Sequence, residues 1–333
     1  MWKPSEAELL DQAVVIALPL RVPFRGLSVR ETMLFRGEEL VSGVSKYGEF
    51  AAFTEYPDEE AAAWLACGIE QAWGLGPTEF ERPFFRDFVK KNATLPAVTA
   101  AEVPDVLKRF GDFRTVKVKV AEKGQDLDDD VARVQAARKF VGDAGRVRID
   151  ANGAWTIDEA ERAIRALEKF DLEYVEQPCA TIPELAEIRE RVADMGILIA
   201  ADESVRKASD PLEVARLGAA DLLVIKVAPL GGVRRSLEII DEAGLPVVVS
   251  SALESEIGLD ASFDLAGRIE HLDYDCGIAT NNLFSHSLYN WDKLGNFLVA
   301  AGEPVPELIE QVRVTGEREQ WWKERAKRCL ALL

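Results

Sequence analysis

Short apolar segments alternate with amphipathic segments from about residue 94 onward. The apolar segments are rich in valine and isoleucine and are five to seven residues long, which predicts buried strands. The segments between them have helical character, and "TIDEAERAIRALEKF" begins with Thr156 and Glu159 in the spacing of a capping box. The predicted strands cover residues 95–100, 115–120, 146–150, 172–177, 197–202, 222–227, 245–251 and 270–276.

Strands that alternate with single helices build a parallel sheet. The predicted strands recur about every 25 residues, which favours a closed TIM-type barrel. An open doubly wound sheet is the alternative, although no Gly-x-Gly-x-x-Gly turn follows the early strands to support it. We therefore expect an α/β barrel domain over residues 94–285.

The two ends of the chain do not show this alternation of apolar and amphipathic segments. Residues 13–20 and 31–37 have the pattern of antiparallel strands, and residues 58–73 that of a helix. Residues 1–93 are therefore expected to form an α+β domain of their own. The tail, residues 286–333, ends in an amphipathic helix, "GEREQWWKERAKRCLALL".

The charge balance narrows the class of protein. The chain has 40 lysines and arginines against 58 aspartates and glutamates, and the net charge of −18 disfavours binding to nucleic acid or anionic lipid. No apolar run is long enough to span a membrane, and no signal-peptide pattern opens the chain. Four widely spaced cysteines and only two histidines disfavour a zinc site. These features predict a soluble, acidic protein of the cytoplasm.

Charged side chains end five successive predicted strands. They are Lys119, Asp150, Glu176, Asp202 and Lys226, at intervals of 31, 26, 26 and 24 residues. One such residue alone is more often a helix N-cap. Because TIM-barrel active sites lie at the carboxyl ends of the strands, five together predict a single site around the mouth of the barrel.

The three carboxylates of this set predict a divalent cation. Asp150, Glu176 and Asp202 lie on neighbouring strands and would repel one another without a positive charge between them. A donor set of oxygen atoms, without histidine or cysteine, favours Mg²⁺, and Mn²⁺ can substitute. Mg²⁺ would leave open positions for the oxygens of a carboxylate substrate.

The strand "TVKVKV" places Lys117 and Lys119 on the same face. A lysine acts as a base only when neutral, which requires its pKa to fall by roughly 2–3 units from about 10.4. A neighbouring ammonium group and a nearby cation both act in that direction. We therefore expect this face to point inward, with Lys117 lowering the pKa of Lys119.

Several motifs resemble the enolase superfamily, muconate-lactonizing subgroup. They are "VKVKV", "RIDANGAW", "YVEQP", "AADES" and "VIKVAPLGGV". The resemblance implies a (β/α)7β barrel with a capping domain made of residues 1–93, against which the tail 286–333 packs. It implies Lys119 and Lys226 as acid/base groups, Asp150, Glu176 and Asp202 as Mg²⁺ ligands, and Asn152 beside the metal.

Within this superfamily, residues 19–31, 47–65 and 250–259 resemble the actinobacterial type of the o-succinylbenzoate synthase family. Members dehydrate 2-succinyl-6-hydroxy-2,4-cyclohexadiene-1-carboxylate in menaquinone biosynthesis. The resemblance implies that Lys119 removes the α-proton and then helps hydroxide to leave from the same face (a syn elimination). Mg²⁺ and Lys226 would stabilise the intermediate ene-diolate.

Two regions are candidates for further substrate contacts. Arg25, in a loop of the capping domain, is expected to contact the polar end of the substrate; the alternative is a solvent-exposed loop arginine. The residues that end the seventh strand are expected to hold the succinyl carboxylate through backbone amides, with plain loop structure as the alternative. They are Ser250, Ser251, Ala252 and Glu254.

Other activities stay open on the same barrel. Asp273–Tyr274–Asp275 resembles the Asp-x-Asp with which dipeptide epimerases bind an ammonium group, and two opposed lysines also suit an N-succinylamino acid racemase. A non-catalytic binding protein is an alternative of another class. Because a carboxylate pair would be costly beside an apolar ring, we predict that at least one of Asp273 and Asp275 points away from the substrate. The sequence does not specify an oligomeric state.

Overall fold

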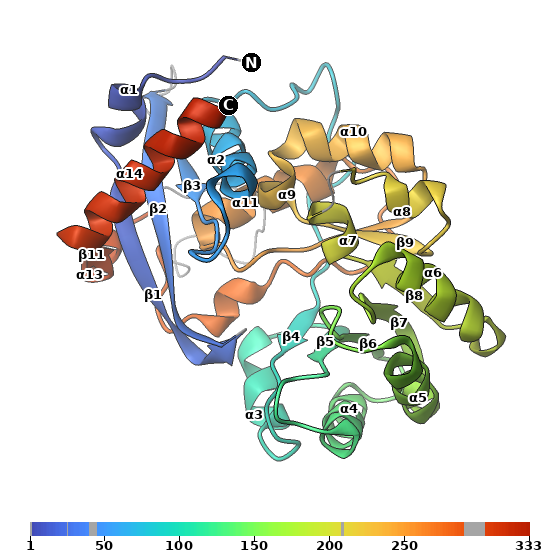
Figure 1. Cartoon of the computed structure of the whole chain (residues 1–333). Helices are drawn as coiled ribbons and strands as arrows, with labels where there is room; N and C mark the ends of the chain where they lie inside the picture. The colour runs from blue at the N-terminus through green and yellow to red at the C-terminus, as the bar shows by residue number, and fades with distance from the viewer. Residues whose placement is uncertain (1, 25, 40–44, 208–209, 290–303) are drawn as a thin grey trace.

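A computed structural model describes residues 2–24, 26–39, 45–207, 210–289 and 304–333. A parallel sheet with helices around it forms one part of the molecule, and an antiparallel sheet with two long helices forms the other (Figure 1). The red C-terminal helix lies along the blue N-terminal strands, so the two ends of the sequence meet in the same part (Figure 1).

The antiparallel sheet has the strand order β11-β1-β2-β3. Its strands are β1 (Val14–Phe24), β2 (Leu27–Glu39), β3 (Ser45–Phe50) and the short β11 (Arg313–Val314). The last of these comes from the tail and pairs with β1, with Val15 opposite Val314. The strand β3 is a third strand, beyond the two that the sequence pattern predicted. It carries Glu49, which accepts a hydrogen bond from the Ser255 N–H of the barrel.

Helix α2 (Asp58–Ala72) packs closely against β3. Gly48 on the strand faces Gly68 on the helix, and a Cβ atom on Gly48 would stand only 2.2 Å from the carbonyl oxygen of Gly68. This approach is possible because neither residue carries a side chain. Helix α14 (Glu317–Leu332) covers α2 and β1, and buries Trp322 against Phe50.

The parallel sheet has seven strands in the order β10-β9-β8-β7-β6-β5-β4. Their bounds agree with the predicted segments to within a few residues, and the curled sheet confirms the barrel. The strands are β4 (Ala93–Leu95), β5 (Thr115–Lys119), β6 (Arg146–Asp150), β7 (Leu172–Glu176), β8 (Leu198–Ala201), β9 (Leu222–Ile225) and β10 (Val247–Val249).

The predicted eighth strand, residues 270–276, is much shorter than expected. Only Cys276 and Gly277 make bridges, to Lys91 on one side and to Ser250 on the other. The Cys276 N–H donates to Lys90 O at 2.8 Å, and the Gly277 N–H donates to Val249 O at 2.8 Å. These two residues therefore join β4 to β10. The polar residues before them do not pair with either strand.

Helices surround the barrel, and several begin where the sequence indicates. Helix α5 has the predicted capping box of Thr156 and Glu159. None of the helices in the described ranges is both long and apolar enough to cross a bilayer. The helices not yet given are α1 (Glu6–Leu10), α3 (Val103–Leu107), α4 (Leu127–Val141), α5 (Ile157–Leu167), α6 (Ile182–Arg191), α7 (Glu203–Arg206), α8 (Glu213–Arg216), α9 (Val227–Leu230), α10 (Val233–Ala243), α11 (Glu256–Arg268) and α13 (Pro306–Gln311).

Candidate active site

The five charged residues that end successive strands meet at one end of the barrel. Asp150, Glu176 and Asp202 are completely buried there, with no exposed surface. Their backbones are locked by the parallel register, in which Lys119 pairs with Asp150 and Asp150 with Glu176. Five charges that are 24 to 31 residues apart in sequence therefore share one small space.

The lysine face of β5 points into this space. Lys117 is only 5% exposed, and its Nζ lies 2.9 Å from Glu176 Oε1 and 3.3 Å from Asp150 Oδ2. Lys119 Nζ donates to Asp150 Oδ2 and, at 2.7 Å, to Asn152 Oδ1. The prediction that the lysines face inward is therefore correct.

The environment of Lys119 favours its neutral form. Burial is the largest cause that lowers its pKa, while Asp150 opposes this and the charge of Lys117 adds to the lowering. Lys117 responds in the opposite direction, because Glu176 and Asp150 outweigh its burial and raise its pKa. One lysine thus stays charged beside another that is easier to deprotonate.

The carboxylates are also unequal. Burial and the neighbouring Asp150 raise the pKa of Glu176 to about 7. The pKa values of Asp150 and Asp202 lie below the ordinary range, although burial acts to raise them, because the lysines around Asp150, and Lys226 and Arg206 beside Asp202, outweigh that effect. The same buried site thus lowers the pKa of two carboxyl groups and raises that of the third.

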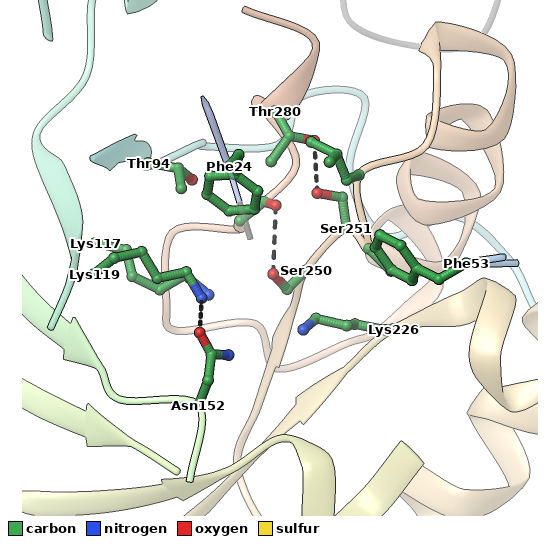
Figure 2. Close-up of a pocket in the computed structure, with 13 residues that line it drawn as sticks. Phe24, Phe53, Thr94, Lys117, Lys119, Asn152, Lys226, Ser250, Ser251 and Thr280 are labelled. Atoms are coloured by element: carbon green, nitrogen blue, oxygen red, sulfur yellow. Dashed lines mark hydrogen bonds between the residues drawn. The ribbon is translucent and has the colours of Figure 1, made fainter. Parts of the chain in front are cut away.

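Lys226, just after β9, approaches from the other side of the pocket. Figure 2 shows Lys117 and Lys119 on one side and Lys226 across from them. Lys226 Nζ donates to Asp202 Oδ2, and the other oxygen of Asp202 accepts a hydrogen bond from Arg206 Nε at 3.0 Å. An acid/base group can therefore act on either face of a substrate bound between the lysines.

Gln177 holds the backbone around Asp202, a role that sequence reasoning missed. Its Oε1 accepts hydrogen bonds from the N–H groups of Asp202 and Ser204, and its Nε2 donates to Ser204 Oγ. Gln177 also has a positive φ of 40°, which turns the chain sharply after β7. The signal was present in the sequence, since Gln177 directly follows Glu176 in "YVEQP".

The pocket above the lysines has a volume of about 410 Å³ that includes space open to solvent. Two aromatic side chains from the first 93 residues, Phe24 and Phe53, reach its wall (Figure 2). Sequence reasoning missed six of the lining residues because nothing in their local pattern marks them. They are Phe24, Phe53, Thr94, Leu253, Gly277 and Thr280.

The loop after β10 lines this pocket, but its first amides are already engaged. The N–H groups of Ser250 and Ser251 donate to Ile225 O and Gly277 O, and that of Ala252 donates to Glu254 Oε2 at 2.7 Å. Glu254 therefore faces its own loop, and the expectation that these amides bind substrate is wrong for residues 250–252. The hydroxyl groups of Ser251 and Thr280, 2.7 Å apart, are the polar groups that face the pocket there (Figure 2).

The Asp-x-Asp motif lies away from the pocket. Asp275 Oδ2 accepts a hydrogen bond from Thr115 Oγ1 at 2.6 Å, and Thr115 begins β5, at the opposite end of the barrel from Lys119. Asp273 is exposed to solvent. Both side chains thus point away, which confirms the prediction for at least one of them. Arg25, the other expected contact, lies outside the described residues.

The donor set fits Mg²⁺, although no ready-made cage exists. Across the described residues, no three side chains of His, Cys, Asp or Glu are grouped closely enough to hold a metal ion. Instead, Lys117 forms a salt bridge with Glu176, and Lys226 forms one with Asp202. Next to Asp202, the buried Glu203 Oε2 has no hydrogen-bond partner. Buried carboxylate oxygens, one of them unsatisfied, are the ligands that a hard cation prefers.

Comparison with known proteins identifies two matching family models. Residues 98–298 match "Enolase C-terminal domain-like", and residues 15–72 match "Enolase N-terminal domain-like". An o-succinylbenzoate synthase of Mycobacterium tuberculosis (strain ATCC 25618 / H37Rv) is 48% identical, over 99% of this chain and 97% of the relative. Another, of Mycobacterium leprae (strain TN), is 47% identical over 99% and 95%.

Solved structures share the fold. A muconate lactonizing enzyme from Pseudomonas fluorescens aligns with a TM-score of 0.75 at 22% identity, covering 91% of this chain and 98% of that one. An L-Ala-D/L-Glu epimerase from Bacillus subtilis aligns with a TM-score of 0.70 at 24% identity, covering 84% and 91%. Both likenesses extend over the barrel and the antiparallel domain together.

Proposed function

The chain belongs to the enolase superfamily, and we propose that it catalyses the o-succinylbenzoate synthase reaction of menaquinone biosynthesis. It is an enzyme of the carbon–oxygen lyase class, and its mycobacterial relatives are named o-succinylbenzoate synthases. The observation that carries the proposal is the pair of lysines, Lys119 and Lys226, opposed across a pocket in a chain 47–48% identical to those synthases.

The reaction removes water from 2-succinyl-6-hydroxy-2,4-cyclohexadiene-1-carboxylate. Neutral Lys119 Nζ takes the proton from the carbon that bears the carboxylate, leaving negative charge on the carboxylate oxygens. Lys226, hydrogen-bonded to Asp202, stabilises that charge from the opposite face. Lys119 then returns its proton to the departing hydroxyl group, so that the carbon–oxygen bond breaks, water leaves and the ring becomes aromatic. Both proton transfers occur on the face of Lys119, which makes the elimination syn.

The metal site completes the proposal. Enolase-superfamily sites use Mg²⁺ with a lysine or histidine base. We assign Asp150, Glu176 and Asp202 as its ligands, with Asn152 beside them and Mn²⁺ as a substitute. When bound, the cation neutralises charge that develops on the substrate carboxylate. Lys117, bonded to Glu176, keeps that ligand oriented.

The far end of the substrate requires separate contacts. We assign the hydroxyls of Ser251 and Thr280 to the succinyl carboxylate, because the amides of residues 250–252 are engaged. Phe24 and Phe53 provide apolar walls for the ring. All four cysteines, which lie in the described part of the chain, are buried free thiols, and this supports a reducing compartment such as the cytoplasm.

A second candidate activity is N-succinylamino acid racemisation. It is favoured by the position of Lys119 and Lys226 on opposite sides of the pocket, since a racemase needs one base for each face. Dipeptide epimerisation is disfavoured, because Asp273 and Asp275 do not reach the pocket to bind an ammonium group.

An ultraviolet assay of ring aromatisation tests the proposal. The purified protein should convert the cyclohexadiene carboxylate to o-succinylbenzoate in Mg²⁺, lose activity in excess chelator and regain it when Mg²⁺ or Mn²⁺ is restored. N-succinylamino acids should be racemised more slowly. Absence of dehydration in Mg²⁺, with fast racemisation in the same preparation, would replace the synthase by the racemase.

A further inference from the structure

The loop between β10 and α11 forms one wall of the pocket through Ser250, Ser251, Ala252 and Leu253. Leu253 has a φ of 66°, in the left-handed region that branched side chains rarely adopt. Such a conformation persists only where the surrounding structure holds it. The contacts that hold this loop therefore decide the shape of the pocket wall.

A buried arginine from the capping domain makes one of these contacts. Arg30, on β2, is only 2% exposed, and its Nε donates to the carbonyl oxygen of Leu253 at 3.1 Å. Its guanidinium group also lies 4.1 Å from the centre of the Phe53 ring and donates to Ala51 O. Arg30 thus joins the strained residue of the loop to Phe53, which lines the same pocket.

A buried glutamate from the next strand makes the other contact. Glu49, on β3, is 3% exposed, and its carboxylate accepts hydrogen bonds from the N–H and hydroxyl groups of Ser255, the latter at 2.7 Å. It also accepts from the Gly258 N–H at 2.7 Å. These donors belong to the N-cap and first turn of α11, where backbone N–H groups lack helical partners.

The packing around Glu49 leaves no space for a side chain at position 258 of the barrel. A Cβ atom on Gly258 would stand 2.5 Å from Glu49 Oε2, so only glycine admits this approach. Within the loop, Glu254 accepts from the Ala252 N–H and closes the turn between the two capping-domain contacts. The loop is therefore fixed from the capping domain at Leu253 and at Ser255.

We infer that Arg30 and Glu49 are positioning residues for substrate binding, which hold residues 250–255 in the shape that places Ser251 beside Thr280 and presents it to the far carboxylate of the substrate. This inference rests on the proposed function. Neither residue lines the pocket, and Lys119, which moves the protons, lies on β5. Loss of either residue should therefore weaken binding of the whole substrate and leave the chemical step almost unchanged.

Glu49→Gln and Arg30→Lys test the inference by kinetics and by calorimetric titration with o-succinylbenzoate. Each should raise KM and the Kd for o-succinylbenzoate about tenfold, with kcat within about twofold of wild type. Ser255→Ala, which alters the same contact from the barrel side, should raise both several-fold and serves if a capping-domain variant does not fold.

Glu70→Gln is the matched control. Glu70 is also a carboxylate of the capping domain that binds the N-terminus of a barrel helix, at Val233 of α10, but it does not touch the loop. Its KM and Kd should stay within about twofold of wild type even if its melting temperature falls. Equal rises in Glu70→Gln, or unchanged KM and Kd in Glu49→Gln and Arg30→Lys, would overturn the inference.

Titration separates this inference from the proposed function. A wild type that binds o-succinylbenzoate but does not catalyse dehydration would refute the proposed function, and the Kd values of the variants would still test the loop contacts. A wild type that does not bind o-succinylbenzoate would overturn both.

Discussion

At the scale of single residues, two lysines on one strand face have different electrostatic surroundings. Lys117 is bonded to both oxygens of Glu176, whereas Lys119 shares its hydrogen bonds between Asp150 and the neutral amide of Asn152. The difference separates their pKa values in opposite directions. The two lysines thus differ in pKa because their hydrogen-bond partners differ, as similar groups with different surroundings do in other proteins.

This difference makes Lys119 the residue whose loss should be most severe. Lys119→Ala should abolish both dehydration and exchange of the α-proton with deuterated solvent, because Lys117, the other lysine on that side of the pocket, stays charged beside Glu176. Lys226→Ala should lower kcat about 10²–10³-fold, as loss of one donor to a developing oxyanion does. Exchange measured by NMR checks the first result, with Lys139→Ala on the surface of α4 as the control. Continued exchange in Lys119→Ala would assign the base elsewhere.

At the scale of elements, the packing of β3 against α2 fixes the strand from which Glu49 reaches the barrel. Two glycines face each other in this contact, and a Cβ on Gly48 would meet the backbone of Gly68. Gly48→Ala should therefore lower the free energy of unfolding by about 1–3 kcal/mol, the usual cost of overpacking.

Urea denaturation checks this value against Gly76→Ala. A Cβ there would meet its nearest neighbour, Glu70 Oε1, at 3.8 Å, so that stability should change by no more than about 0.5 kcal/mol. Equal stability of the two variants would contradict the close approach of strand and helix.

At the scale of the whole molecule, buried carboxylates link stability to pH. Burial raises the pKa of Glu254 and of Asp260 to about 7, although hydrogen bonds, for Asp260 that from Tyr289, act against it. In the unfolded chain these groups titrate near about 4. The folded protein therefore binds more protons between these values, and the stability contributed is full below about pH 4 and is lost as pH rises through about 7.

Asp260→Asn removes one of these titrations. The variant should show a smaller fall in melting temperature than wild type between about pH 5 and pH 8, because an amide does not ionise. Differential scanning calorimetry over this range checks the difference. Asp143→Asn, which changes an exposed aspartate, should keep the slope of wild type; an unchanged slope in Asp260→Asn as well would show that this carboxyl does not titrate in the range.

The sequence by itself determined the barrel and the charged residues at its mouth. Parallel strands repeat one pattern, and each strand's last residue is set by local alternation, so Lys119, Asp150, Glu176, Asp202 and Lys226 could be placed at one end before any contact was known. The period of two placed Lys117 and Lys119 on one face, and the charges at the neighbouring strand ends predicted that this face points inward. These features are local in the chain and repeat along it.

Tertiary structure alone decided which groups are free to act. The amides of residues 250–252 are engaged by residues 2 to 26 positions away, and Asp275 turns to Thr115, 160 positions away, at the far end of the barrel. Arg30 and Glu49 reach the pocket loop across more than 200 positions. Hydrogen bonds of this kind depend on how segments distant in the sequence meet, and no periodicity within one segment records that geometry.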